Sequence, residues 1–193
     1  MEPEHNTDII SPWMERGYRT FAYEGPQGLK VERLASEVGK NKSSFYHHFA
    51  EVEVFISRLL RYHLEQAKVM AAKEAEIKSL DDLVETIIEH KVDMLFNRQL
   101  RIHRENPEFH ECFMKTNQMT AESFAPLWAK LLELDDNAQL AGLVLKLSME
   151  NFYLQITDET LNSHWLRAYF EGFRELVRAF KSNGDRKALN GTV

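Results

Sequence analysis

The chain has 193 residues, of which 44% are hydrophobic and 28% are charged, and its formal net charge is −6 at pH 7. These values are ordinary for a globular protein with one sizeable core or two small domains, and they exclude a largely disordered chain. A single cysteine, Cys112, excludes an intrachain disulfide, and no uncharged apolar run approaches the roughly 18 residues that a membrane span needs. The N-terminus is acidic and polar, unlike a secretory signal, so we expect a cytoplasmic protein.

The first predicted helix covers about Asp8 to Glu24, where apolar residues recur at helical spacing and form a broad face. Two glycines and one proline then break the pattern between Glu24 and Gly28, which predicts a loop. No lysine or arginine precedes Arg16, so we expect no basic arm that reaches into a minor groove. This helix is expected to brace the two helices that follow it.

Residues Val31 to Phe49 are predicted to form two short helices joined by a turn. Gly39 follows the last apolar residue of the first helix, at the position where glycine enters a left-handed cap without a Cβ penalty. Asn41 or Ser43 can cap the second helix, in which Phe45 lies four residues before Phe49 and predicts a buried face. Two short helices with a glycine-bearing turn are typical of the helix-turn-helix, whose second helix enters the major groove of DNA.

The segment from Val38 to Ala50 contains no acidic residue, although the chain as a whole is acidic. Phosphate affinity depends on local positive charge, so this segment is suited to DNA. An ordinary helical hairpin would also bury the two phenylalanines, but it would not explain an acid-free polar face. The predicted DNA contacts are lysine, serine, tyrosine and histidine side chains that can donate to phosphates or base edges, namely Lys40, Lys42, Ser43, Ser44, Tyr46 and His47.

Residues Phe21 to Phe55 resemble the N-terminal domain of TetR-family transcriptional regulators. The most specific part of the resemblance is Gly39 followed by residues 44–49, with the sequence SFYHHF. The resemblance implies an all-α protein in which a three-helix head with the helix-turn-helix is joined by a long helix to a C-terminal body for ligand binding and dimerisation. The expected domains are a DNA-binding domain at residues 1–50, an effector-binding and dimerisation domain at residues 51–183, and a flexible tail at residues 184–193.

Three positions depart from the family pattern. Lys30 and Glu32 stand where the family usually has a threonine and then a basic residue, and Val52 stands where it often has a lysine that contacts phosphate. With the acidic balance of the chain, these residues leave a second hypothesis open. In it, the protein is a helical ligand-binding or protein-interaction module with weakened or lost DNA binding. A third and remote hypothesis is an enzyme built on a helical bundle.

The rest of the chain shows helical periodicity almost throughout. The first long helix contains no proline or glycine, so it is a natural rigid connector between the head and the remaining chain. The expected helices cover about Val52 to Ile77, Ser79 to Arg104, a short stretch from Asn106-Pro107 through Met114, Met119 to Leu134 with Pro126 at a late start or a kink, Asp136 to Ile156 after a cap at Asp135-Asp136, and Asp158 to Lys181.

The last two expected helices are the most hydrophobic in the chain. The first of them carries apolar residues on two sides, which requires two packing partners. The resemblance implies that both helices pair with their copies in a four-helix homodimer interface. Gly142 and Gly172 would allow close approach of the helices there.

Aromatic and methionine residues in the body could line a cavity or fill a solid core. The resemblance favours a cavity, because family members bind small effectors there, and an apolar lining favours a mostly apolar ligand. It therefore implies a transcriptional repressor that binds a near-palindromic operator as a homodimer and is released by a small effector. The candidate ligand contacts are Phe96, Phe109, Phe113, Met114, Phe124, Trp128, Met149, Phe152 and Tyr153.

No metal site, cofactor or catalytic residue is expected. The only Glu-x-x-His spacing in the sequence is that of Glu2 with His5, which is expected to lie outside the helical bundle. No His-x₃-His pair occurs. His110 and Cys112 are two residues apart, so on a helix they point in different directions. The sequence has no glycine-rich phosphate loop and no nucleophile elbow, so we predict that the protein is not an enzyme.

Overall fold

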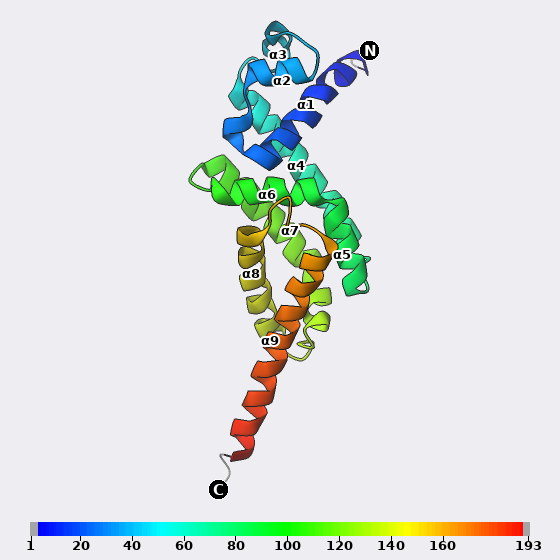
Figure 1. Cartoon of the computed structure of the whole chain (residues 1–193), viewed down its shortest axis with the longest axis vertical. Coiled ribbons are helices and arrows are strands. Elements are labelled where there is room, and N and C mark those ends of the chain that lie inside the picture. The colour runs from blue at the N-terminus through cyan, green and yellow to red at the C-terminus, as the bar shows by residue number, and fades with distance from the viewer. Residues whose placement is uncertain (1–3, 191–193) are drawn as a thin grey trace. The chain divides into compact units, whose positions relative to one another are not determined.

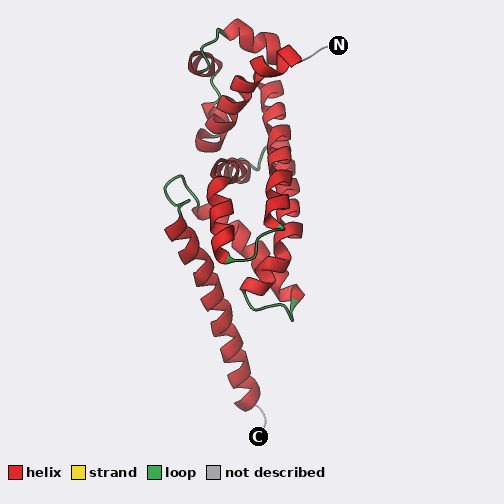
Figure 2. Ribbon diagram, turned by 90° about the vertical axis from the view of Figure 1, so that its right-hand side faces the viewer, coloured by secondary structure: helices red, strands yellow, loops and turns green. Residues whose placement is uncertain are grey.

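The computed structural model describes residues 4–190, and the side chains of residues 11–181. Within that range all regular secondary structure is helical, as Figures 1 and 2 show, which confirms the predicted all-α fold. The loop predicted after the first helix contains a short 3₁₀ helix, η1 (Pro26–Gly28). The α-helices are α1 (Glu4–Glu24), α2 (Val31–Glu37), α3 (Lys42–Phe49), α4 (Val52–Glu74), α5 (Leu80–Glu89), α6 (Lys91–Ile102), α7 (Pro107–Leu131), α8 (Ala138–Gln155) and α9 (Ser163–Asn190).

Contacts within the chain define two compact units. Unit 1 comprises Met1–Val69 and His90–Met119, and unit 2 comprises Met70–Glu89 and Thr120–Val193. Helices α4 and α7 therefore each begin in unit 1 and end in unit 2. The helix-turn-helix segment belongs to unit 1, whereas α8 and α9 belong to unit 2.

An aromatic cluster in unit 1 joins the head, which we define as α1 to α3, to the start of α4. Trp13 meets Phe45 edge-on at a ring-centroid distance of 5.4 Å, and Phe55 lies 5.2 Å from Phe45 and 4.7 Å from Phe49. All four side chains are at most 1% exposed. Helices α1 and α4 approach closely at Gly17, where an added Cβ would lie 2.2 Å from the Phe55 ring. Burial of each such ring stabilises the fold by roughly 1.5–3 kcal/mol.

The turn between α2 and α3 has the predicted glycine cap. Gly39 has a positive φ of 66°. Its N–H donates to the Ser36 carbonyl at 3.2 Å, and the N–H of Lys40 donates to the Ala35 carbonyl at 2.9 Å. These two bonds form a Schellman motif, which satisfies the last carbonyls of α2. Helix α3 is capped by Asn41 rather than Ser43, because Asn41 Oδ1 accepts from the Ser44 N–H at 2.8 Å.

A buried polar network also holds α1 against α4 and α6 in unit 1. The Tyr18 hydroxyl donates to Asp93 Oδ1 at 2.6 Å, and its oxygen lies 2.7 Å from His63 Nδ1. A hydroxyl carries one proton, so His63 Nδ1 must bear its own proton and donate it to Tyr18. His63 Nε2 faces the side-chain amide of Asn97 at 3.4 Å. Burial lowers the pKa of His63 to about 4, so its ring is neutral near pH 7.

Unit 2 has an aromatic core to which α7, α8 and α9 contribute. Trp128 of α7 is 1% exposed and lies 5.9 Å from the Phe170 ring of α9. Phe152 of α8 meets the Tyr169 ring of α9 at 5.6 Å, and the Tyr169 hydroxyl donates to the Ser148 carbonyl at 2.6 Å. These contacts tie the last two helices together within one unit.

One carboxyl group is buried in unit 2. Glu74, the last residue of α4, is 3% exposed, and the Ser123 hydroxyl donates to its Oε2 at 2.6 Å. Burial raises the pKa of Glu74 to about 7, although the bond from Ser123 partly opposes this rise. The C-terminal end of a helix also disfavours a negative charge. Glu74 is therefore neutral over part of the physiological pH range.

Two predicted helix starts are confirmed. Ser79 Oγ accepts from the Asp82 N–H at 3.1 Å, and Asp82 Oδ2 accepts from the Ser79 N–H at the same distance, which is a reciprocal capping box. Asn106 Oδ1 accepts from the Glu108 N–H at 2.9 Å, with Pro107 as the first helical residue.

The helix predicted from Ser79 to Arg104 is wrong, because the structure has two helices there, α5 and α6. His90 lies between them with φ −95° and ψ 24°, and its Nδ1 is 2.8 Å from Asp93 Oδ2. The same carboxylate accepts the Tyr18 hydroxyl, so tertiary contacts determine this break.

The two helices predicted on either side of Met119 are instead one helix, α7, which continues through Pro126. A proline inside a helix removes one backbone hydrogen bond. Phe124 and Trp128 flank Pro126 and are 7% and 1% exposed. Their packing offsets the lost bond, since most helical stability in proteins comes from tertiary contacts.

Two further predicted helix ends are shifted. Helix α4 ends at Glu74 rather than Ile77. Between these two residues the backbone forms turns that are tighter than those of an α-helix. The cap of α8 is Asn137 rather than Asp136, because Asn137 Oδ1 accepts from the Leu140 N–H at 3.0 Å. A side-chain amide oxygen one residue later performs the function expected of the aspartate.

The last helix begins at Ser163 rather than Asp158. Thr157 and Thr160 form a local turn first, with the Thr157 N–H donating to Thr160 Oγ1 at 2.7 Å. Helix α9 also continues past Lys181, into the segment predicted to be a flexible tail, and residues 191–193 of that prediction lie outside the described residues.

Candidate nucleic-acid interface

Helix α3 has one buried face and one exposed face. Phe45 and Phe49 are 0% and 1% exposed, whereas Tyr46 between them is 48% exposed. This division follows from the helical repeat, since residues four apart lie on one side and their neighbours point away. The structure places all six predicted DNA contacts on α3 and the turn before it, with Ser44 half-buried and Lys40, Lys42, Ser43, Tyr46 and His47 exposed.

Several cations of the head are paired with acids from neighbouring elements. Arg33 of α2 lies 2.5 Å from a Glu24 oxygen and 2.9 Å from a Glu37 oxygen, and Arg16 of α1 lies 2.5 Å from Glu37. Hydrogen bonds from Arg16 and then Arg33 lower the pKa of Glu37 to about 2. These ion pairs join α2 to α1, so both arginines are already engaged within the head.

Lys42, the first residue of α3, is paired with an acid of α2. Its Nζ lies 2.7 Å from Glu32 Oε1, and the two side chains are 56% and 68% exposed. This hydrogen bond raises the pKa of Lys42 and lowers the pKa of Glu32. Lys30 and Lys40 are exposed and have no ion pair among the described residues. This pair could not be predicted from the sequence, because the two residues lie ten positions apart and the turn between α2 and α3 brings them into contact.

Two histidines end the exposed face of α3. His47 is exposed and His48 is half-buried, with their ring centroids 5.2 Å apart. Burial lowers the pKa of His48, and the nearby charges of His47 and Arg58 lower it further. Arg58 of α4 also lies over the Phe49 ring, 5.2 Å from its centroid. His47 is therefore the histidine that is accessible to a nucleic acid, and His48 is part of the packing behind it.

Helix α3 ends in a strained turn. Ala50 has φ 61° and ψ −50°, and the Glu51 N–H donates to the Phe49 carbonyl at 2.7 Å. This i→i+2 bond around a positive φ is a γ-turn, which costs a residue with a side chain of order 1–3 kcal/mol. The turn directs the chain from α3 into α4 within two residues.

The predicted effector contacts are divided between the two units. In unit 1, Phe96 is fully buried and stacks on Phe21 at 4.2 Å and on Tyr18 at 4.5 Å, so its ring is part of the core. Met114 is 54% exposed. Unit 1 also contains Phe109 and Phe113, and unit 2 contains Phe124, Trp128, Met149, Phe152 and Tyr153. Whether these residues line a cavity stays a prediction.

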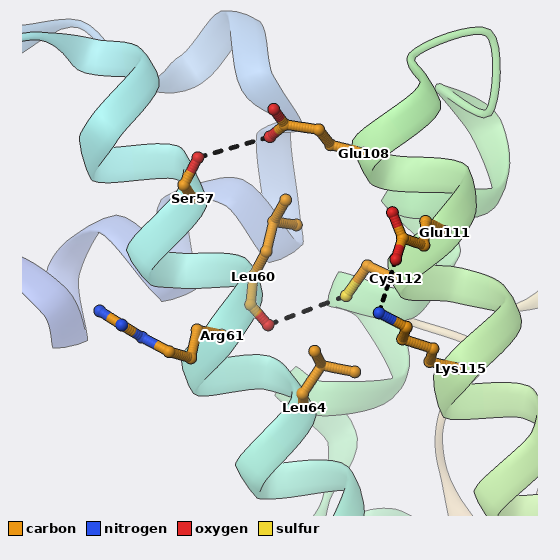
Figure 3. Close-up of a pocket in the computed structure, with 8 residues that line it drawn as sticks. All are labelled: Ser57, Leu60, Arg61, Leu64, Glu108, Glu111, Cys112 and Lys115. Carbon is orange, nitrogen blue, oxygen red and sulfur yellow. Dashed lines mark hydrogen bonds and ion pairs between the residues drawn. The ribbon is translucent and has the colours of Figure 1, made fainter.

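A pocket of about 210 Å³ lies between α4 and α7 in unit 1 (Figure 3). Its acids are already bonded, since Ser57 donates to Glu108 at 3.4 Å and Lys115 lies 2.6 Å from Glu111. The Cys112 thiol donates to a backbone carbonyl of α4, and burial raises its pKa to about 12, so little thiolate forms near pH 7. The lining differs from the predicted effector contacts and comprises Ser57, Leu60, Arg61, Leu64, Glu108, Glu111, Cys112 and Lys115.

The part of the chain that the structure describes contains neither a metal-binding cluster nor a helix suited to span a membrane. No three His, Cys, Asp or Glu side chains within that part of the chain come together as a metal-binding group. None of the helices described has both the length and the apolar character of a membrane span.

Over most of its length the chain is similar to a transcriptional repressor. It is 25% identical over 178 residues to the HTH-type transcriptional repressor AcnR of Corynebacterium diphtheriae, which covers 91% of this chain and 83% of that protein. Salmonella enterica GusR has a similar structure, with a TM-score of 0.59 and 15% identity over 93% of this chain and 96% of that one. A protein of Mesorhizobium loti described as a TetR-family transcriptional regulator has a TM-score of 0.54 and 14% identity over 90% and 98%. No protein-family model matches the sequence.

The helix-turn-helix head, the all-α fold and these similarities define the class of protein, which is a helix-turn-helix transcriptional regulator. Within that class, the repressor similarity and the shared fold support a TetR-family regulator, in agreement with the resemblance of residues 21–55. At 14–15% identity the solved structures define the fold, and the sequence similarity to a repressor supplies the functional class.

Proposed function

We propose that the protein is a transcriptional repressor that binds duplex DNA through α3. One observation carries this proposal. Over an acid-free segment of an acidic chain, α3 exposes lysine, serine, tyrosine and histidine side chains while Phe45 and Phe49 fix its opposite face in the core. An exposed polar helix after a glycine turn has the form of a recognition helix that binds in the major groove of DNA. Lysine supplies charge for phosphates, and hydroxyl and imidazole groups supply donors for phosphates and base edges.

The proposed DNA-binding form is a homodimer. Two recognition helices about 34–36 Å apart would reach successive major grooves on one side of B-DNA and would read a near-palindromic operator. The support lies in unit 2, where α8 and α9 expose apolar side chains that the unit itself does not cover. On α8 these are Leu140, Leu143, Leu147 and Leu154, and on α9 they are Leu176 and Phe180.

The backbone of these helices is also open to a partner at two glycines. A Cβ added at Gly142 or Gly172 would meet no atom within 4 Å. The periodicity of the exposed leucines, at positions 140, 143, 147 and 154, is that of a helix-packing stripe. We therefore assign α8 and α9 as the surface that pairs with a second copy.

A small, mostly apolar effector is proposed to release the operator, with the aromatic and methionine residues of the body as its candidate contacts. Helix α4 runs uninterrupted from the end of α3 into unit 2, so a change at its far end can alter the placement of the head. The effector needs only a differential affinity for two arrangements of the chain, typically about 1–3 kcal/mol.

DNA binding is tested by fluorescence anisotropy with a labelled random-sequence duplex at low salt. The wild type is expected to bind, with an affinity that falls as NaCl rises from about 50 to 200 mM, because nonspecific binding depends on phosphate contacts. Lys40→Ala removes an exposed lysine that has no ion pair with any described residue, so it should flatten the slope of log K against log salt by about 0.9. A wild type that binds no duplex would instead favour the ligand-binding or protein-interaction module.

The homodimer is tested by sedimentation velocity of Leu147→Glu. Leu147 is 60% exposed in the single chain, so the substitution leaves the unit intact but places a charge in the proposed interface. We expect monomers. Ala138→Glu is a matched control, because Ala138 is exposed on the opposite side of α8 and the charge change is the same. If Leu147→Glu remains dimeric, α8 is not the interface.

A further inference from the structure

We propose that Glu32 limits DNA affinity by competing with the DNA backbone for Lys42. This inference rests on the proposed function, because it concerns how the same head binds phosphate. In the absence of DNA, the Glu32 carboxylate would occupy the place of a phosphate oxygen beside Lys42. DNA must then displace this carboxylate before Lys42 can neutralise a phosphate.

The geometry of the pair supports the proposal. Glu32 lies in the first turn of α2 and Lys42 is the first residue of α3, and the turn at Gly39 brings them to an Nζ–Oε1 distance of 2.7 Å. A carboxylate and a phosphate present the same anionic oxygen acceptors to an ammonium group. Lys42 cannot satisfy both without sharing its charge between them.

The exposure of the pair makes displacement feasible. Lys42 is 56% exposed and Glu32 is 68% exposed, so solvent surrounds both groups and screens their attraction. Glu37 differs in this respect, since its carboxylate joins two arginines from α1 and α2 and is 24% exposed. Glu37 therefore joins helices of the head, whereas the ion pair of Glu32 is with Lys42 of α3.

The position of Glu32 also lowers the net positive charge at the exposed face of α3. Residues 38–50 contain no acid, and the Glu32 carboxylate brings a negative charge to this segment from α2. With Glu32 in place, Lys42 adds little net positive charge to the exposed face of α3. Without it, Lys42 becomes a full phosphate contact, and the released counterion should steepen the salt dependence by about 0.9.

The experiment compares wild type, Glu32→Gln, Lys42→Met and the double variant by anisotropy with a random-sequence duplex across a NaCl series. Glu32→Gln should bind up to about eightfold more tightly at 0.1 M salt, with a slope steeper by about 0.9, since one additional phosphate contact scales as the 0.9 power of the salt concentration. In the Lys42→Met background, Glu32→Gln should change affinity by about twofold or less, because only screened repulsion remains.

A matched control isolates the pair from a general change in net charge. Glu65 lies in an exposed ion pair with Lys68 on α4, with an Nζ–Oε1 distance of 2.8 Å and exposures of 60% and 57%. Glu65→Gln alters the net charge equally but leaves α2 and α3 unchanged, so it should bind DNA like the wild type. Far-UV circular dichroism verifies that each variant retains its helices.

The outcomes separate this inference from the proposed function. If wild type and Glu32→Gln bind the duplex equally, Glu32 does not compete, although the protein still binds DNA. Weaker binding by Glu32→Gln would mean that the carboxylate holds Lys42 in its binding position, and an undiminished gain in the Lys42→Met background would mean that Lys42 is not involved. Either result overturns the inference. If neither protein binds duplex at low salt, the proposed function and the inference both fail.

Discussion

Unit 1 and unit 2 bury polar side chains in different ways. In unit 1, Tyr18, His63 and Asp93 form a buried hydrogen-bonded chain, and burial lowers the pKa of His63 to about 4, so its ring is neutral near pH 7. In unit 2, the buried carboxyl of Glu74 accepts a hydrogen bond from the Ser123 hydroxyl, and burial raises its pKa to about 7. Burial disfavours the charged form of both groups, so it lowers the pKa of the histidine and raises the pKa of the carboxyl. Unit 1 is therefore expected to lose stability from His63 as the pH falls from about 6.5 to 4, and unit 2 from Glu74 as the pH rises through about 7.

The exposed faces differ as well. Helix α3 of unit 1 exposes polar and cationic side chains, whereas α8 of unit 2 exposes leucines with Leu147 at 60% and Leu154 at 64%. Each helix buries its other face in the core, so packing within the chain explains the residue types on that buried face and not those on the exposed face. Polar donors suit a nucleic acid and leucines suit another apolar helix, so the composition of the exposed half indicates the kind of partner.

The largest effect is expected from Phe45→Ala. This side chain is 0% exposed and packs on Trp13 and Phe55, so its loss leaves a cavity and should lower the free energy of unfolding by about 3–5 kcal/mol. Tyr46→Ala is the control on the next residue. It should change stability by about 0.5 kcal/mol or less, while weakening DNA binding. Urea denaturation and duplex titration of both variants measure the contrast, and equal losses of stability would contradict the two-faced character of α3.

The next effect concerns Glu74 and pH. The folded-state pKa is about 7 and the unfolded value is 4.5, so the protein binds this proton more tightly when folded. Stability from this group is complete below pH 4.5 and is lost as the pH rises through 7. At about pH 8.5 the loss approaches 3 kcal/mol, which Glu74→Gln should recover because the amide stays neutral.

The measurement is urea denaturation of wild type and Glu74→Gln at about pH 5 and pH 8.5 and at one protein concentration. The two proteins should be similar in stability at the acidic pH and should diverge at the alkaline pH. The variant Glu65→Gln, which changes an exposed glutamate of the same helix, should follow the wild type at both. Parallel profiles for wild type and Glu74→Gln would show that Glu74 does not titrate in this range.

The smallest effect is expected from Ala50→Gly. The positive φ of Ala50 is unfavourable for a residue with a Cβ and is accessible to glycine, so the substitution should stabilise the head by about 1 kcal/mol. Thermal unfolding followed by circular dichroism measures the change. A lower melting temperature would mean that the entropy of glycine in the unfolded chain exceeds the strain at the turn.

The helix-turn-helix could be predicted closely because its determinants are local. Gly39 ends α2, Asn41 begins α3, and the spacing of Phe45 and Phe49 sets the buried face, all within the span of one turn or two. The same holds for the caps at Ser79 and Asn106. Each of these features depends on residues within five positions of one another.

Other features depend on residues far apart in the chain and could not be predicted. The break at His90 depends on Asp93, whose second oxygen binds a tyrosine 75 residues away. The pairing of Lys42 with Glu32 changes the charge of the candidate site, although each residue alone was identified in the sequence. The high pKa of Glu74 arises from burial, which a position at the end of an amphipathic helix does not reveal.

The shortness of α3 has a consequence for how a protein with the proposed function would change its target. Of its eight residues, Phe45 and Phe49 are the ones that the core requires. The positions that face outward can be exchanged at little cost in folding, since surface substitutions usually alter stability by about 0.5 kcal/mol or less. A gene duplicate could therefore acquire a new promoter through a few substitutions while the scaffold stays the same, so selection can act on target choice and on folding independently.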